Sequence, residues 1–148
     1  MASNNDKVFD FIAHEEKVDK LIKCSFASSY MSNAKWRKCF SLLEEKAPDV
    51  QLIWKFVGAQ NEGVRYGIPP IEALEEKYIN SRFWYGPMYY KEIEWLEFPR
   101  VKKPYGKEKI PGAHVAQDIE QLKNELENIG SWQIEESKEG FKLYGHKQ

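Results

Sequence analysis

Apolar side chains recur at helical spacing in three stretches of the chain. Residues 6–27 carry an apolar position every three or four residues among aspartate, glutamate and lysine, which is typical of an amphipathic helix. A second stripe follows Ser32, a predicted N-cap, and ends before Pro48, which cannot continue a helix. The third helix is predicted over residues 116–129, with Gly130 as a left-handed C-cap.

Alternation at period two predicts β-strands between these helices. Residues 50–57 and 64–68 flank a glycine-containing turn and predict one hairpin. Residues 132–135 and 141–144 predict a second hairpin, and residues 89–98 alternate as a longer strand. Short turns between neighbouring strands favour antiparallel pairing.

The segment between the first hairpin and the long strand is less regular. Residues 71–80 fit either a short helix or a long irregular excursion. Taken together, the elements predict an α+β fold class, a single domain over residues 1–148, with an antiparallel sheet of about five strands and helices packed mainly on one face. Residues 1–29 are predicted to form an N-terminal helical extension of this domain.

The densest aromatic clustering lies in residues 83–99, at the predicted central strand. Ile93 and Trp95 fall on one face, which predicts their burial, and Glu92 and Glu94 fall on the other, which predicts that they face solvent. After Trp95 the apolar residues change face. The change predicts either a β-bulge or a strand whose end is covered on both faces.

This central stretch is the first candidate functional surface. Aromatic side chains beside carboxylates suit protein recognition, because aromatic anchors supply affinity and charges supply register and association rate. The alternative is an ordinary solvent-facing side of a strand. The predicted partner-binding residues are Tyr85, Tyr89, Tyr90, Glu92, Glu94, Trp95 and Glu97.

A basic stretch punctuated by proline and glycine, residues 100–112, is predicted to be an exposed loop. Its cations surround one tyrosine, an arrangement that could bind phosphates and stack a base; a solvated loop is the alternative. The candidate nucleic-acid-binding residues are Arg100, Lys102, Lys103, Tyr105, Lys107 and Lys109.

Charge and cysteine content narrow the possible functions. A formal net charge of −1 gives no overall field to steer nucleic acid, so nucleic acid is not the expected partner. Cys24 and Cys39 are too few for a disulfide framework and are predicted to be buried free thiols. The chain shows no signal peptide and no apolar run near the roughly 20 residues that span a bilayer, so a cytoplasmic protein without membrane contact is expected.

Motifs for catalysis, cofactors and metals are absent from the sequence. The stretch beginning at His14 lacks the second histidine of a zinc-protease helix, and no histidine is spaced with a cysteine as in a metal site. His114 could act as a general base only if a carboxylate met it in space. We therefore expect no catalytic residue, no cofactor and no metal, and a protein that is not an enzyme.

Three segments together resemble a family of small uncharacterised bacterial proteins. They are the S-N-x-K-W-R-like opening of the second helix in residues 32–40, the G-P-x-x-Y-K-E-I-E-W segment in residues 86–98, and the closing helix and hairpin. The resemblance covers about residues 30–145 and implies no assigned activity. In size and style the chain is similar to immunity proteins that neutralise bacterial toxins.

The functional expectation is a non-enzymatic protein-binding module, most concretely an immunity-like or antitoxin-like inhibitor that occludes a bacterial toxin domain. In this interpretation the glutamates of residues 83–97 pair with cations in the toxin's cleft, and an aromatic side chain fills a pocket. The alternative is a small nucleic-acid-binding protein that uses the basic loop, residues 100–109.

Overall fold

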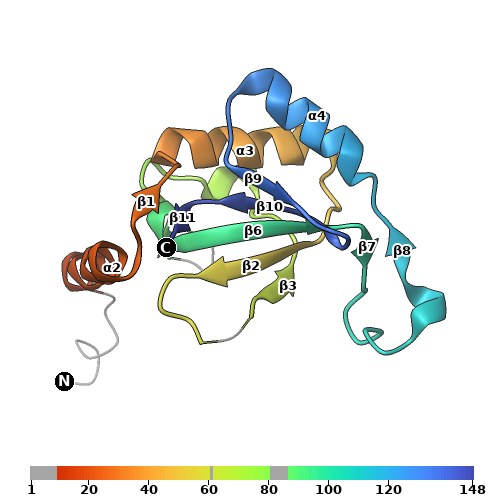
Figure 1. Ribbon diagram of the computed structural model, residues 1–148, viewed down its shortest axis with the longest axis horizontal. Helices are drawn as coiled ribbons and strands as arrows, with labels where there is room; N and C mark the ends of the chain where they lie inside the picture. Colours follow the sequence, from red (N-terminus) through yellow and green to blue (C-terminus); the bar gives the residue numbers. More distant parts are fainter. Residues whose placement is uncertain (1–9, 61, 81–86) are drawn as a thin grey trace.

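A five-stranded antiparallel sheet with the strand order β3-β2-β6-β10-β9 forms the centre of the computed structural model (Figure 1). The structure describes residues 10–60, 62–80 and 87–148. The five strands are β2 (Leu52–Phe56), β3 (Val64–Tyr66), β6 (Ile93–Pro99), β9 (Ile134–Glu136) and β10 (Gly140–Tyr144). Both predicted hairpins are present, and the α+β fold with an antiparallel sheet is confirmed.

Helices α3 (Asn33–Lys46) and α4 (Ile119–Ile129) lie together over one face of this sheet (Figure 1). Ser32 caps α3 as predicted, and Asp118 caps α4. The left-handed cap predicted at Gly130 is wrong, because this glycine is extended, with φ 175°. Instead, the indole N–H of Trp132 donates to the carbonyl of Leu126 at 2.6 Å and satisfies one of the last helical acceptors.

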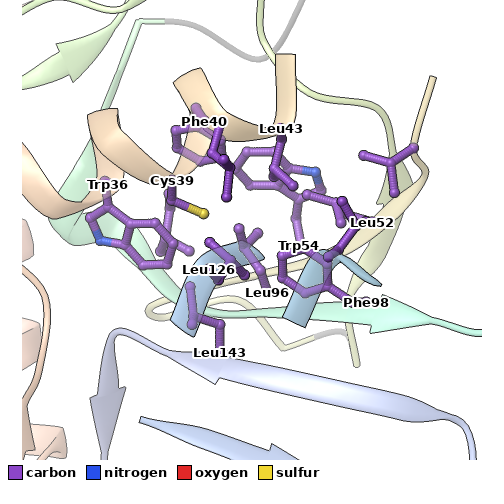
Figure 2. Close-up of a cluster of buried hydrophobic side chains, with 14 of the residues drawn as sticks. Trp36, Cys39, Phe40, Leu43, Leu52, Trp54, Leu96, Phe98, Leu126 and Leu143 are labelled. Atoms are coloured by element: carbon purple, nitrogen blue, oxygen red, sulfur yellow. The ribbon is translucent and has the colours of Figure 1, made fainter. Parts of the chain in front are cut away.

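The hydrophobic core fills the space between the two helices and the sheet. Phe40 of α3 stacks on Trp54 of β2, with ring centroids 5.4 Å apart, and Phe98 stacks on Phe141 across the β6–β10 pair at 4.4 Å. Figure 2 shows core residues from α3, α4, β2, β6 and β10: Trp36, Cys39, Phe40, Leu43, Leu52, Trp54, Leu96, Phe98, Leu126 and Leu143.

Strand β6 shows both features predicted for its change of face, a β-bulge and burial on both faces. Opposite β2, Lys55 pairs with Trp95 while Phe56 pairs with Ile93, so Glu94 is an extra, bulged residue. Leu96 then lies in the core, and Trp95 on the opposite face is buried as well. The bulge precedes Trp95 and keeps Ile93 and Leu96 on the same face, so the prediction that Ile93 and Trp95 share a face is wrong, although both are buried.

The helix predicted over residues 71–80 is wrong, and the irregular alternative fits. Only a single 3-10 turn forms, η1 (Ile71–Ala73), before the chain folds back into strand β4 (Tyr78–Ile79). Strand β4 pairs with β5 (Met88–Tyr89), and the next turn, η2 (Tyr90–Glu92), leads into β6. Complete burial of Ile79 and its strand pairing outweigh the helical spacing.

The N-terminal extension forms helix α2 (Phe11–Ser25), which begins at the N-cap Asp10 and buries Val18 against the domain. It leads into strand β1 (Ser28–Ser29), which pairs with the C-terminal strand β11 (His146–Lys147). A third short ribbon joins β7 (Val101–Lys102) to β8 (Val115–Ala116), with the turn η3 (Pro111–Ala113) between them. No helix among the described residues is long and apolar enough to cross a bilayer.

The two cysteines occupy different environments. Cys39 is fully buried in the core, and burial raises the pKa of its thiol to about 12. Cys24 is a free thiol on the exposed side of α2, so its predicted burial is wrong. Its position lies off the face on which Val18 packs, and the two cysteines are not bonded.

We expect protonation of His146 to weaken the contact of strand β11 with strand β1 and with Lys91. Its Nε2–H donates to the carbonyl of Lys91 at 2.8 Å, and its Nδ1 accepts from the hydroxyl of Ser29 at 2.7 Å. Burial lowers the pKa of His146 below its usual 6.5. As pH falls below that value the unfolded chain therefore takes up the proton first, and stability falls with it.

The measurement is the free energy of unfolding of wild type and His146→Gln between neutral and mildly acidic pH. Glutamine keeps a donor for the Lys91 carbonyl but does not titrate. The free energy of unfolding of the variant should therefore fall less than that of the wild type as the pH is lowered. An unchanged slope in His146→Gln would contradict this assignment.

Candidate functional site

Two glutamates of the central stretch contact residues of this same chain. Glu92 Oε1 lies 3.0 Å from His14 Nε2, and its Oε2 accepts the backbone N–H of Tyr89 at 2.8 Å. Glu94 Oε1 lies 3.5 Å from Lys55 Nζ. The side chains of Glu92 and Glu94 are only 15% and 20% exposed, so the expectation that they face solvent is wrong.

The aromatic residues of the same stretch are buried where the structure describes them. Tyr89, Tyr90 and Trp95 are all buried, and the Tyr90 hydroxyl donates to the carbonyl of Glu75 at 2.7 Å. Burial raises the pKa of Tyr90 to about 12. Tyr85 lies outside the described residues. Rings held in this way are not exposed as anchors for a partner.

Helix α2 covers this stretch. Lys91 Nζ lies 2.5 Å from Glu15 Oε2 and 2.7 Å from Asp19 Oδ1, and the Tyr89 hydroxyl donates to the carbonyl of Phe11 at 3.1 Å. Burial alone would lower the pKa of Lys91, but the hydrogen bonds to Asp19 and Glu15 raise it overall. Glu15 and Asp19 are four residues apart and so share one helix face, but nothing in the sequence indicates that Lys91 is their partner.

Trp95 and Glu97 lie on the face of the sheet opposite the helices. The ammonium of Lys142 lies 4.2 Å from the Trp95 ring centroid, within cation–π range. Glu97 is half-buried between the cross-strand neighbours Lys142 and Ile53. It is the one predicted glutamate without an ion-pair partner among the described residues.

The basic loop is an ordered arm. We use this name for residues 100–116, which comprise β7, η3 and β8 and extend beyond the sheet on the opposite side of the molecule from α2 (Figure 1). Within the arm, Lys107 N–H donates to the Pro104 carbonyl at 2.9 Å, and Ile110 N–H donates to the Lys107 carbonyl at 3.1 Å. The His114 ring donates to the Glu108 carbonyl at 3.0 Å.

Two glutamine side chains fix the base of the arm. Gln51 accepts the backbone N–H of Lys103 at 2.9 Å and donates to the carbonyl of the same residue at 2.8 Å, as a neighbouring strand would. Gln117 donates to the Pro99 carbonyl at 2.9 Å and accepts the Gln51 backbone N–H at 2.8 Å. Sequence patterns gave no sign of this clamp, because glutamine carries no distinctive spacing.

Large apolar side chains are exposed mainly on the arm. Of the six large hydrophobic residues that are exposed within the described parts of the chain, four belong to it: Val101, Tyr105, Ile110 and Val115. Tyr105 is 97% exposed. Beside it a hollow of about 560 Å³ separates the arm from the body, with Pro48, Tyr66 and Ile68 among its lining residues.

The cations of the arm differ in how far they are already engaged. Arg100 Nη1 lies 3.1 Å from Glu120 Oε1, and Lys102 Nζ donates to the carbonyl of Asp49 at 2.9 Å. The ammonium groups of three other cations form no ion pair with the described residues: Lys103, Lys107 and Lys109. The basic loop therefore keeps uncompensated positive charge next to its exposed apolar side chains.

His114 lines a separate hollow of about 540 Å³ at the base of the arm, together with Glu97 and Glu139. Its Nε2–H is engaged by the Glu108 carbonyl, and it forms no hydrogen bond with either of these carboxylates. The hollow therefore contains a histidine and two carboxylates, as a general-base site would, but it lacks the histidine–carboxylate hydrogen bond that such a site uses to orient the imidazole ring.

Within the described residues, no group of three or more His, Cys, Asp or Glu side chains is placed to hold a metal ion. Comparisons of the chain with protein-family models, with curated proteins and with solved structures gave no match. The resemblance in residues 32–40 and 86–98 stays a prediction.

Proposed function

We propose that this protein is a non-enzymatic protein-binding module, most concretely an immunity-like inhibitor, and that the arm is its contact surface. The observation that supports this most directly is the exposure of Val101, Tyr105, Ile110 and Val115 on one projecting element. Exposed apolar side chains bordered by charge are typical of protein interaction sites.

The charge on the arm defines the chemistry of the partner. Residues 100–116 contain five Lys or Arg residues and one acidic residue, Glu108, which gives 5 − 1 = +4 with His114 neutral. A complementary partner surface is therefore acidic. This reverses the sign expected from residues 83–97, where Glu92 and Glu94 are engaged within the chain.

The shape of the arm suits occlusion of a concave site. Tyr105 stands almost fully exposed in the arm, where a tyrosine can enter a pocket as an anchor. The clamp formed by Gln51 and Gln117 holds the base in place, so little conformational entropy is lost when the arm binds. An ordered, basic arm inserted into an acidic cleft would block access of substrate to that cleft.

We expect Tyr105→Ala together with Ile110→Ser to weaken partner binding strongly while leaving the fold intact. Both side chains are exposed, so their removal costs the domain about 0.5 kcal/mol or less. Removing an interface anchor costs about 2 kcal/mol or more in binding, which lowers affinity at least about thirtyfold. The measurement compares proteins captured from native cells by the wild type and by the variant.

Ile12→Ser is the matched control, because Ile12 is an isoleucine 74% exposed on α2, away from the arm. The control should capture the same protein as the wild type. Undiminished capture by the arm variant, or equal loss in Ile12→Ser, would overturn the assignment of the arm.

A second candidate function is nucleic-acid binding by the same arm. The observation in its favour is the exposed ring of Tyr105 between Lys103 and Lys107, which could stack a base beside phosphate contacts. This function predicts salt-dependent binding of single-stranded RNA or DNA that Lys107→Glu with Lys109→Glu weakens. The exposed aliphatic side chains favour protein, because Val101 and Ile110 offer nothing to a phosphate backbone.

A further inference from the structure

The hollow at the base of the arm gathers charged side chains from four separate segments. Arg65 comes from β3, Glu97 from β6, Lys103 from the arm, and Lys138 and Glu139 from the β9–β10 turn. Its volume of about 540 Å³ lies in the range of small-ligand sites. Of these side chains only Lys103 also belongs to the arm, the proposed protein contact.

The cations of this hollow are positioned to receive an anion. Arg65 Nη1 donates to Gln51 Oε1 at 3.0 Å and to the Val101 carbonyl at 3.1 Å, which fixes the guanidinium. Its Nη2 and Nε donate to no group of the described residues. The ammonium groups of Lys103 and Lys138 form no ion pair with the described residues, whereas Arg100, which also lines the hollow, is paired with Glu120. A fixed guanidinium with two lysines suits a phosphoryl dianion.

The two carboxylates of the hollow restrict the ligand further. Glu97 and Glu139 accept hydrogen bonds but cannot donate them when ionised, and they would repel a ligand that carries only anionic oxygens. A ligand that satisfies both sets of groups therefore carries hydroxyl groups as well as a phosphoryl group.

We propose that this hollow binds a ribose phosphate group. The phosphoryl oxygens contact Arg65, Lys103 and Lys138, and the sugar hydroxyls donate to Glu97 and Glu139. The group can come from a free sugar phosphate or nucleotide, or from an RNA chain, since both present the same chemistry.

The test is calorimetric titration of the full chain with ribose 5-phosphate, ribose, inorganic phosphate and a short single-stranded RNA. Ribose 5-phosphate should bind at least about tenfold more tightly than ribose or phosphate alone, because only it uses both sets of groups. Lys103→Glu with Lys138→Glu should weaken the binding of ribose 5-phosphate at least about tenfold. Lys20→Glu with Lys23→Glu makes the same charge change at two exposed positions of α2, on the opposite side of the molecule, and should leave the binding of ribose 5-phosphate within about twofold of wild type.

Glu97→Gln separates the hydroxyl contact from simple charge. This change should weaken the binding of ribose 5-phosphate but should not weaken the binding of inorganic phosphate. If RNA binds more tightly than ribose 5-phosphate, and the Lys103 and Lys138 changes remove that binding, the natural ligand is an RNA chain. If RNA binds more weakly than ribose 5-phosphate, the natural ligand is the free compound. Failure of ribose 5-phosphate and RNA to bind at millimolar concentration, or equal loss in the Lys20 and Lys23 control, would overturn the proposal without affecting the proposed protein contact.

Discussion

Replacement of Trp54 by alanine should lower the free energy of unfolding by about 4 kcal/mol, the largest loss expected from a single side-chain truncation here. The ring is fully buried at the centre of the sheet, stacks on Phe40 at 5.4 Å and donates its indole N–H to the Gly67 carbonyl at 3.1 Å. Its removal opens a cavity between α3 and β2 and leaves that carbonyl without its donor. Denaturant titration measures the loss.

Tyr105→Ala is the matched control for this measurement, because it truncates an aromatic residue of similar size that is almost fully exposed. Its unfolding free energy should stay within about 0.5 kcal/mol of the wild type. A loss below about 1 kcal/mol in Trp54→Ala would contradict the position of this ring in the core.

Gly140→Ala should destabilise the protein by about 3 kcal/mol or more, because two independent penalties fall on one residue. Gly140 has φ 155°, and a Cβ built on it would lie 2.0 Å from the backbone oxygen of Phe98. The clash is with main chain of the adjacent strand β6, so neither side can move without breaking the pairing of Gly140 with Pro99. Thermal or denaturant unfolding measures the loss.

Gly112→Ala provides the comparison for this change. Gly112 lies on the arm, and a Cβ there would meet nothing within 4 Å. Its replacement should change stability by less than about 0.5 kcal/mol in either direction. Equal stability of the Gly140 and Gly112 variants would show that β10 does not approach β6 as closely as described.

The sheet could be predicted from the sequence because its strands alternate locally and turn residues separate them. The change of face near Trp95 indicated the bulge in β6 as one of two solutions, because a period of two cannot otherwise bring Ile93 and Leu96 to one face. Residues 71–80 were ambiguous for a physical reason: their helical spacing competes with long-range pairing of β4 to β5, and spacing alone contains no information about that partner.

The candidate surfaces were harder to predict, because exposure depends on what packs over a strand. Alternation places Glu92 and Glu94 opposite their neighbours, but it cannot show that α2 brings His14 to Glu92 or that Lys55 faces Glu94. The identities of the arm's cations and of Tyr105 were evident from the sequence. The ordered structure of the arm was not evident, because it depends on the side-chain amides of Gln51 and Gln117.

The most direct test of the arm as the contact surface is backbone hydrogen–deuterium exchange, measured on the protein alone and in complex with the partner that it captures. Slower exchange across residues 101–115 in the complex, with residues 89–97 and helix α2 unchanged, is the result expected here. New protection confined to residues 89–97 or to α2, with the arm exchanging as in the free protein, would contradict it.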